Sequence, residues 1–117
     1  MAIPSGSGTE VLKVHYLRTV TNSAQLLLPT TEANHIYTIL SIVVTDEGGN
    51  AEQFYIYRKT AADGDMTRIL HTQDIPANGT FVWNDKFVLS GTDKLSIETT
   101  NAANLHVMTS YIEQDWS

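Results

Sequence analysis

The sequence consists of short runs rich in β-branched and aromatic residues, each ended by glycine, proline, asparagine or aspartate. Runs of this kind are typical of β-strands, and the residues between them are typical of turns. No stretch keeps the 3.6-residue apolar spacing of a helix over three turns. About eight strands at spacings near ten residues predict an all-β fold: a single-domain antiparallel β-sandwich of jelly-roll-like form.

The individual strands follow from the same pattern. Residues 35–44 are apolar at both alternating positions, as expected for a central strand that is covered on both faces. The glycines at 48 and 49 tolerate positive φ, so this strand and the next, 53–58, are expected to form a hairpin. The other predicted strands are 11–19, 24–28, 66–72, 80–83, 87–89, 94–98 and 105–112.

Alternation within two of these strands predicts which side chains share a face. In the strand 53–58, Phe54 and Ile56 are expected on one side and Tyr55 and Tyr57 on the other. In the strand 105–112, one face is expected to carry Leu105, Val107 and Thr109. Between the strands, Asn78-Gly79 is a strong turn signal, and the Pro before it removes a ladder donor.

The 117 residues are enough for one domain with its own core. Residues 1–9 are rich in Gly, Ser, Pro and Thr and are expected to form a flexible N-terminal arm, whereas residues 10–117 form the sandwich with a C-terminal docking tail. Ile3 and Pro4 are apolar residues in the arm, and Trp116 is a large ring in the tail. We expect these three residues, together with Trp83, to contact neighbouring subunits.

Charge and cysteine content exclude several classes of function. The formal net charge of −6 repels phosphate backbones and anionic headgroups, so neither nucleic acid nor a membrane is expected as a partner. The absence of cysteine excludes disulfides, thiolate catalysis and cysteine-based zinc sites. The sequence shows no signal-peptide pattern and no run of 18 apolar residues, which predicts a soluble protein made in a cytoplasm.

No motif of catalysis or metal binding is present, so we expect no enzyme, no cofactor and no metal. The sequence contains neither Gly-x-Ser-x-Gly nor Ser-x-x-Lys. The four histidines, at positions 15, 35, 71 and 106, lack the close spacing of a ligand pair. They are expected to be partly buried or to face solvent.

Three turn-containing stretches carry a resemblance to a known family. They are residues 74–83 with the sequence DIPANGTFVW, residues 87–95 with FVLSGTDKL, and residues 101–105 with NAANL. The chain resembles, over residues 40–112, small β-sandwich decoration (cement) proteins of tailed bacteriophages, which share an "IPANGT" corner and an "L-x-x-G-D-K-L" corner. Here Thr92 stands between Gly91 and Asp93, where that pattern has Gly directly before Asp.

The resemblance implies a virion structural protein on the capsid surface, synthesised in the host cytoplasm. It implies self-association as a dimer or trimer, and contact with the major capsid protein, whose subunits it would brace. Two other functions are also open: a structural protein of the neck or tail, and a carbohydrate-binding surface module. The latter would use exposed aromatic residues such as Tyr55, Tyr57 or Trp83.

Overall fold

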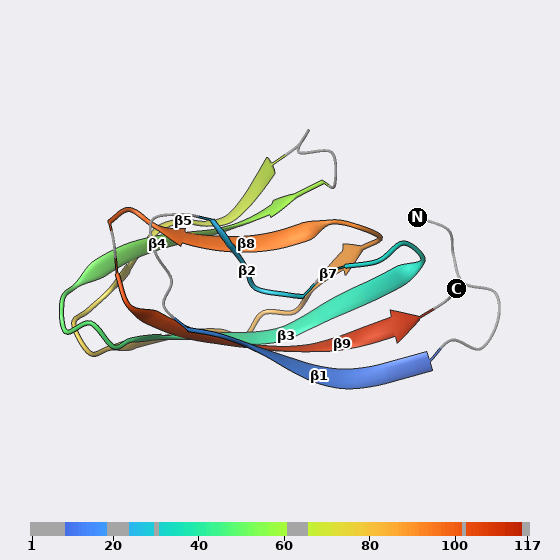
Figure 1. The fold of residues 1–117 in the computed structure, drawn as a ribbon, viewed down its shortest axis with the longest axis horizontal. Helices are drawn as coiled ribbons and strands as arrows, with labels where there is room; N and C mark the ends of the chain where they lie inside the picture. The colour runs from blue at the N-terminus through green and yellow to red at the C-terminus, as the bar shows by residue number, and fades with distance from the viewer. Residues whose placement is uncertain (1–8, 19–23, 30, 61–65, 102, 116–117) are drawn as a thin grey trace.

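The computed structural model describes residues 9–18, 24–29, 31–60, 66–101 and 103–115. These residues form nine strands and no helix (Figure 1). The strands are β1 (Thr9–Leu17), β2 (Gln25–Leu26), β3 (His35–Asp46), β4 (Glu52–Lys59), β5 (Met66–Ile75), β6 (Thr80–Trp83), β7 (Phe87–Ser90), β8 (Lys94–Thr99) and β9 (Leu105–Asp115).

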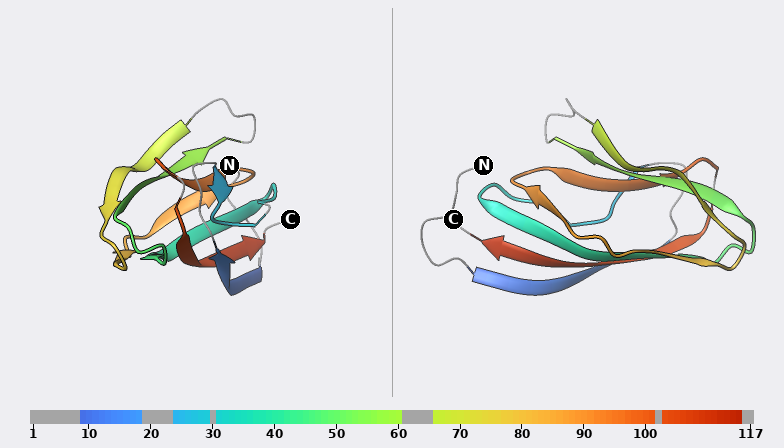
Figure 2. Two further views of the ribbon diagram at one scale, coloured as in Figure 1. Left: turned by 60° about the vertical axis from the view of Figure 1, so that its left-hand side comes forward. Right: turned by 180° about the vertical axis from the view of Figure 1, so that it is seen from behind.

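The strands form two antiparallel sheets that stack face to face (Figure 1, Figure 2). Sheet A has the order β1-β9-β3-β6, and β7 also pairs with β3; sheet B has the order β2-β8-β4-β5. Because β6 and β7 pair with successive halves of β3, they act as one interrupted strand. Eight strands divided in this way between two sheets make a jelly roll, which confirms the predicted fold class.

The core lies between the sheets and is built from alternate side chains of each strand. Phe54 and Ile56 point into it, while Tyr55 and Tyr57 share the opposite face, as predicted. Burying an aliphatic or aromatic side chain of this size contributes about 1.5–3 kcal/mol. The core cluster also includes Leu27, Leu28, Tyr37, Ile39, Ile42, Val44, Ile75, Leu89, Leu95, Ile97, Leu105, Val107 and Tyr111.

The predicted turn after β5 is confirmed. The backbone N–H of Gly79 donates to the carbonyl of Pro76 at 2.9 Å, and Asn78 adopts a positive φ of 58°. Asparagine tolerates this conformation better than most residues. The turn returns the chain to sheet A, where β6 pairs with β3.

The predicted hairpin between β3 and β4 is wrong, because the two strands belong to different sheets. The connection is fixed by long-range hydrogen bonds: Asp46 N–H donates to the carbonyl of Gly79, and Glu47 N–H donates to that of Asn104. The buried carboxylate of Asp46 also accepts a bond from the N–H of Gly48 at 2.8 Å. These bonds direct the chain from sheet A to sheet B. Gly49 in this connection adopts a positive φ of 79°, which glycine tolerates.

The strand β3 is central in sheet A, as predicted, since it pairs with β9 on one side and with β6 and β7 on the other. The prediction that both its faces are covered is wrong. Its inner face is fully buried, but its outer face is only half-buried, and a bulge between Ile39 and Ser41 interrupts the alternation.

The structure describes only part of the predicted N-terminal arm and C-terminal tail. Thr9 is the first residue of β1 and not the last residue of the arm. Three predicted contact residues, Ile3, Pro4 and Trp116, lie outside the described residues.

Candidate functional site

Trp83 is the predicted contact residue that the structure does describe. It lies on the inner side of β6, where its ring meets Phe87 edge to face at 6.4 Å and packs against the core cluster. Its indole N–H donates to the carbonyl of Asp85 at 2.8 Å. Trp83 is therefore half-buried, and its contact role remains a prediction.

The tyrosines considered for sugar stacking do not form a common platform with Trp83. Tyr55 and Tyr57 lie on sheet B, whereas Trp83 lies on sheet A. Both phenols donate hydrogen bonds to Glu98, and burial together with this bond raises the pKa of Tyr57 to about 12. Arg68 lies 5.1 Å from the ring centre of Tyr55, so a cation occupies the face that a sugar would need.

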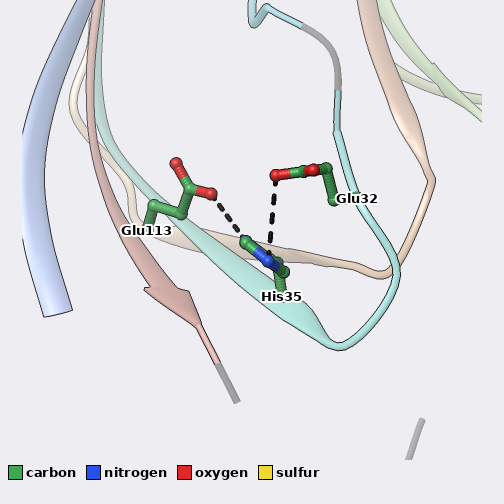
Figure 3. Close-up of side chains that lie close together, drawn as sticks. All are labelled: Glu32, His35 and Glu113. Atoms are coloured by element: carbon green, nitrogen blue, oxygen red, sulfur yellow. Dashed lines mark hydrogen bonds and ion pairs between the residues drawn. The ribbon is translucent and has the colours of Figure 1, made fainter. Parts of the chain in front are cut away.

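A polar cluster at one end of the sandwich brings together His35 and acidic residues (Figure 3). His35 begins β3, and Glu113 lies near the end of the adjacent β9. Nδ1 of His35 is 2.6 Å from Glu113 Oε2, and Nε2 is 3.3 Å from Asp115 Oδ1 and 3.8 Å from Glu32 Oε2. Both ring nitrogens therefore face carboxylates.

Lys13 of β1 completes the cluster, with Nζ 2.7 Å from Oε1 of Glu113. The bond from Lys13 is the largest cause of a lowered pKa of Glu113, opposed by burial and reinforced by His35. The same bond raises the pKa of Lys13. The cluster thus joins the middle of β1 to the ends of β9 and β3 by charge-assisted hydrogen bonds.

The donor set of Glu32, His35 and Glu113 could accept a cation, since one ligand atom from each lies within 4.8 Å of the others. Lys13 already neutralises Glu113, however, so the arrangement is satisfied as an ion-pair network. Sequence reasoning missed this cluster because His35 and Glu113 are 78 positions apart. Only the pairing of β3 with β9 brings them together.

The outer face of sheet A exposes several large apolar side chains. Paired residues on neighbouring strands point the same way, so the strand register defines rows of side chains that cross the sheet. The central row is Val14, Ser110 and Ser41. One flanking row is Leu12, Ile112, Thr38 and Val88, and the other is Tyr16, Met108, Val43 and Val82.

These three rows, which we call the apolar face, contain no charged residue. Leu12 and Tyr16 on the edge strand are 68% and 69% exposed, and Val82 and Val88 on the far side of the sheet are more than half exposed. Large contiguous apolar patches are rare on monomeric proteins and mark contact sites. The outer face of β3, which the sequence predicted to be covered, lies at the centre of this patch.

Sheet B presents the opposite character on its own outer face. Its side chains there include Lys59 and Tyr57 of β4, Lys94 and Glu98 of β8, and Arg68 of β5. Such a surface is well suited to water. The two outer faces therefore differ: charged side chains lie on sheet B and are absent from the apolar face of sheet A.

A shallow hollow of about 530 Å³ lies at one end of the apolar face. Its lining includes Tyr16, Val43 and Met108 from one flanking row, with Arg18 beside Tyr16. A neighbouring surface could therefore insert a side chain here. The sequence held a signal for this face, because Leu12, Val14 and Tyr16 alternate with Lys13 and His15, and residues 35–44 are apolar at both alternating positions.

Comparisons with known proteins identify the fold and no family. No family model matches the chain, and no curated protein matches its sequence. A protein of Bacillus endospore appendages, described as disulfide-linked pili, superposes with a TM-score of 0.60 at 17% identity. That match covers 100% of this chain and 97% of the appendage chain.

Two chains from infectious bursal disease virus also superpose. The Gx strain gives a TM-score of 0.56 at 11% identity, over 97% of this chain and 34% of the viral chain. The T13 particle gives 0.57 at 10% identity, over 90% and 31%. This chain thus spans about a third of each viral chain, and the likeness shows the shared sandwich fold.

No helix in the described residues is long and apolar enough to cross a membrane.

Proposed function

We propose that this chain is a non-enzymatic virion structural protein that decorates the outside of a tailed-bacteriophage head. In this role it stabilises contacts between major capsid protein subunits, as the resemblance in residues 40–112 implies. The observation that carries the proposal is the uncharged apolar face on sheet A. A face of this kind is useful to a protein that works by binding other protein surfaces.

The physical basis is multivalency on a symmetric shell. A rigid two-sheet body holds its outer face in a fixed shape, so binding costs little ordering of the backbone. Each contact can be weak, because the symmetry of the shell repeats it many times. The shared fold of the viral chains is compatible with this role.

Electron cryo-microscopy of virions made with and without this chain tests the proposal. We expect hundreds of copies on the head lattice, and we expect heads that lack the chain to release DNA at a lower temperature. Copies confined to the neck or tail, or equal thermal resistance of the two kinds of head, would contradict a decorating and bracing role.

A filament subunit is a second candidate, and the whole-length match to the endospore appendage protein favours it. This chain has no cysteine, so a filament built from it could not be disulfide-linked. Negative-stain microscopy of the concentrated protein distinguishes the two functions. Filaments would support the second candidate and argue against the first.

A further inference from the structure

We infer that the apolar face binds the same face of a second copy of this chain, about a two-fold axis that runs along the central row of Val14, Ser110 and Ser41. The inference rests on the proposed structural function, because it assigns a partner to the surface that carries that function.

The rows make the face complementary to itself. Rotation about the central row reverses the strand direction, so each flanking row meets the other flanking row of the second copy. Leu12 of one copy then lies over Tyr16 of the other, beside the hollow. The axis runs between the copies, over Ser110 and Ser41, whose small side chains allow close approach at the centre.

The charges at the ends of β1 favour this orientation. Glu10 precedes the face on the same side of β1, and Arg18 follows it beside Tyr16. The rotation places Glu10 of one copy over Arg18 of the other, twice in each dimer. A two-fold axis parallel to the strands would leave each Glu10 away from Arg18, so the charges select the axis along the central row.

The rest of the charge distribution favours a second copy over a charged partner. The chain carries a net charge of −6, so two copies repel wherever their acidic surfaces approach each other. The apolar face is free of charge, and two copies can meet there without burying like charges. A basic partner would instead be attracted to the acidic surfaces elsewhere.

The area is sufficient for a specific contact. Strands lie about 4.8 Å apart and residues on one face repeat about every 6.8 Å, so four strands and five rows cover about 650 Å² on each copy. The two outermost rows are mostly polar and form a rim. One row is Glu10, Gln114, Ile36 and Ser90, and the other includes His106, Thr45 and Thr80. The total of about 1,300 Å² is within the range of specific interfaces, near its lower end.

Sedimentation equilibrium of the purified full chain over a range of concentrations tests the dimer. We expect a concentration-dependent dimer, and we expect Tyr16→Glu to raise its dissociation constant at least 100-fold by placing an unpaired charge in the interface. Met66→Glu is the matched control, since Met66 is 48% exposed on sheet B. We expect it to leave the constant unchanged, and circular dichroism checks that both variants fold.

Charge reversal tests the orientation. Within one chain, Glu10 and Arg18 are separated by about 27 Å of extended strand, so they cannot contact each other. Glu10→Arg and Arg18→Glu should each weaken the dimer about threefold to tenfold, and the double variant should restore it. Restoration can arise only between copies, because the two positions are so far apart in each one.

The outcomes separate this inference from the proposed function. A chain that stays monomeric, or a Tyr16→Glu variant that dimerises like the wild type, overturns the dimer. If such a chain still decorates heads in high copy number, the proposed function survives alone. A dimer that responds to both tests but is absent from virions supports the inference and refutes the proposed function. A double reversal without restoration refutes the proposed axis.

Discussion

Gly79 occupies a position at which a larger residue collides with the preceding proline. A Cβ atom placed there would lie 2.5 Å from Cγ of Pro76, well inside van der Waals contact. The pyrrolidine ring is stiff, so the backbone of the turn must shift to make room. We expect Gly79→Ala to lower the free energy of unfolding by about 1–3 kcal/mol, measured by denaturant titration.

Gly48→Ala is the control for this prediction. A Cβ at Gly48 meets its nearest neighbour, Oδ1 of Asp46, at an ordinary 3.5 Å. We expect this variant to unfold with the stability of the wild type, within about 0.5 kcal/mol. Equal losses at the two glycines would show that the collision with Pro76 is not the cause.

Two buried threonines differ in whether their hydroxyl groups are bonded. Thr109 in β9 is fully buried and its Oγ1 has no partner among the described residues, whereas Oγ1 of Thr99 donates to the carbonyl of Asn101. A buried polar group without a partner costs stability. We therefore expect Thr109→Val to raise the free energy of unfolding by about 1 kcal/mol and Thr99→Val to lower it by a similar amount.

Thermal unfolding of the two threonine variants is the measurement. A lower melting temperature for Thr109→Val would contradict the prediction and would point to a bond that the described residues do not supply.

At this same scale the sequence predicted correctly which side chains of β4 face the core, because alternation is a local property.

At the scale of elements, local patterns located the strands but could not assign them to sheets. The strands from β5 to β9 were predicted within a few residues, since each is bounded by Pro, Gly or Asn. The connection between β3 and β4 was predicted as a hairpin. Its course is instead fixed by backbone hydrogen bonds to the carbonyls of Gly79 and Asn104, which are distant in sequence. The cluster at His35 was missed for the same reason, since strand pairing decides it.

The ion pair between β1 and β9 makes stability depend on pH. The folded-state pKa of Glu113 is lowered, chiefly by Lys13, so the unfolded chain binds its proton first as the pH falls. The stabilising contribution is complete above the ordinary pKa of 4.5 and is lost as the pH falls through the lower folded value. We expect Glu113→Gln to flatten the loss of stability that accompanies a fall in pH below about 4.5.

Lys13→Met provides a matched second variant, because it removes the largest cause of the lowered pKa and leaves the carboxyl group in place. Denaturant titrations at several pH values should show a smaller flattening than in Glu113→Gln, since the bond with His35 remains. An unchanged pH dependence in Glu113→Gln would refute the assignment of this stability to Glu113.

At the scale of the whole molecule, the two outer faces divide the work of the fold. The charged face of sheet B suits contact with water, and the apolar face of sheet A is available for protein contacts. The low charge of the sequence predicts a role in protein contacts. The apolar residues of β3 predict a strand that is covered on both faces. The covering surface belongs to another subunit in our account, which explains why one sequence could not reveal it.

The most direct test of the apolar face as an assembly surface is a competition for incorporation into virions. Tyr16→Glu and Met66→Glu proteins are each expressed together with the wild type, and the ratio of variant to wild type in purified virions is measured by mass spectrometry. We expect Tyr16→Glu to be depleted at least tenfold and Met66→Glu to match the wild type. Equal incorporation of the two variants would contradict this expectation.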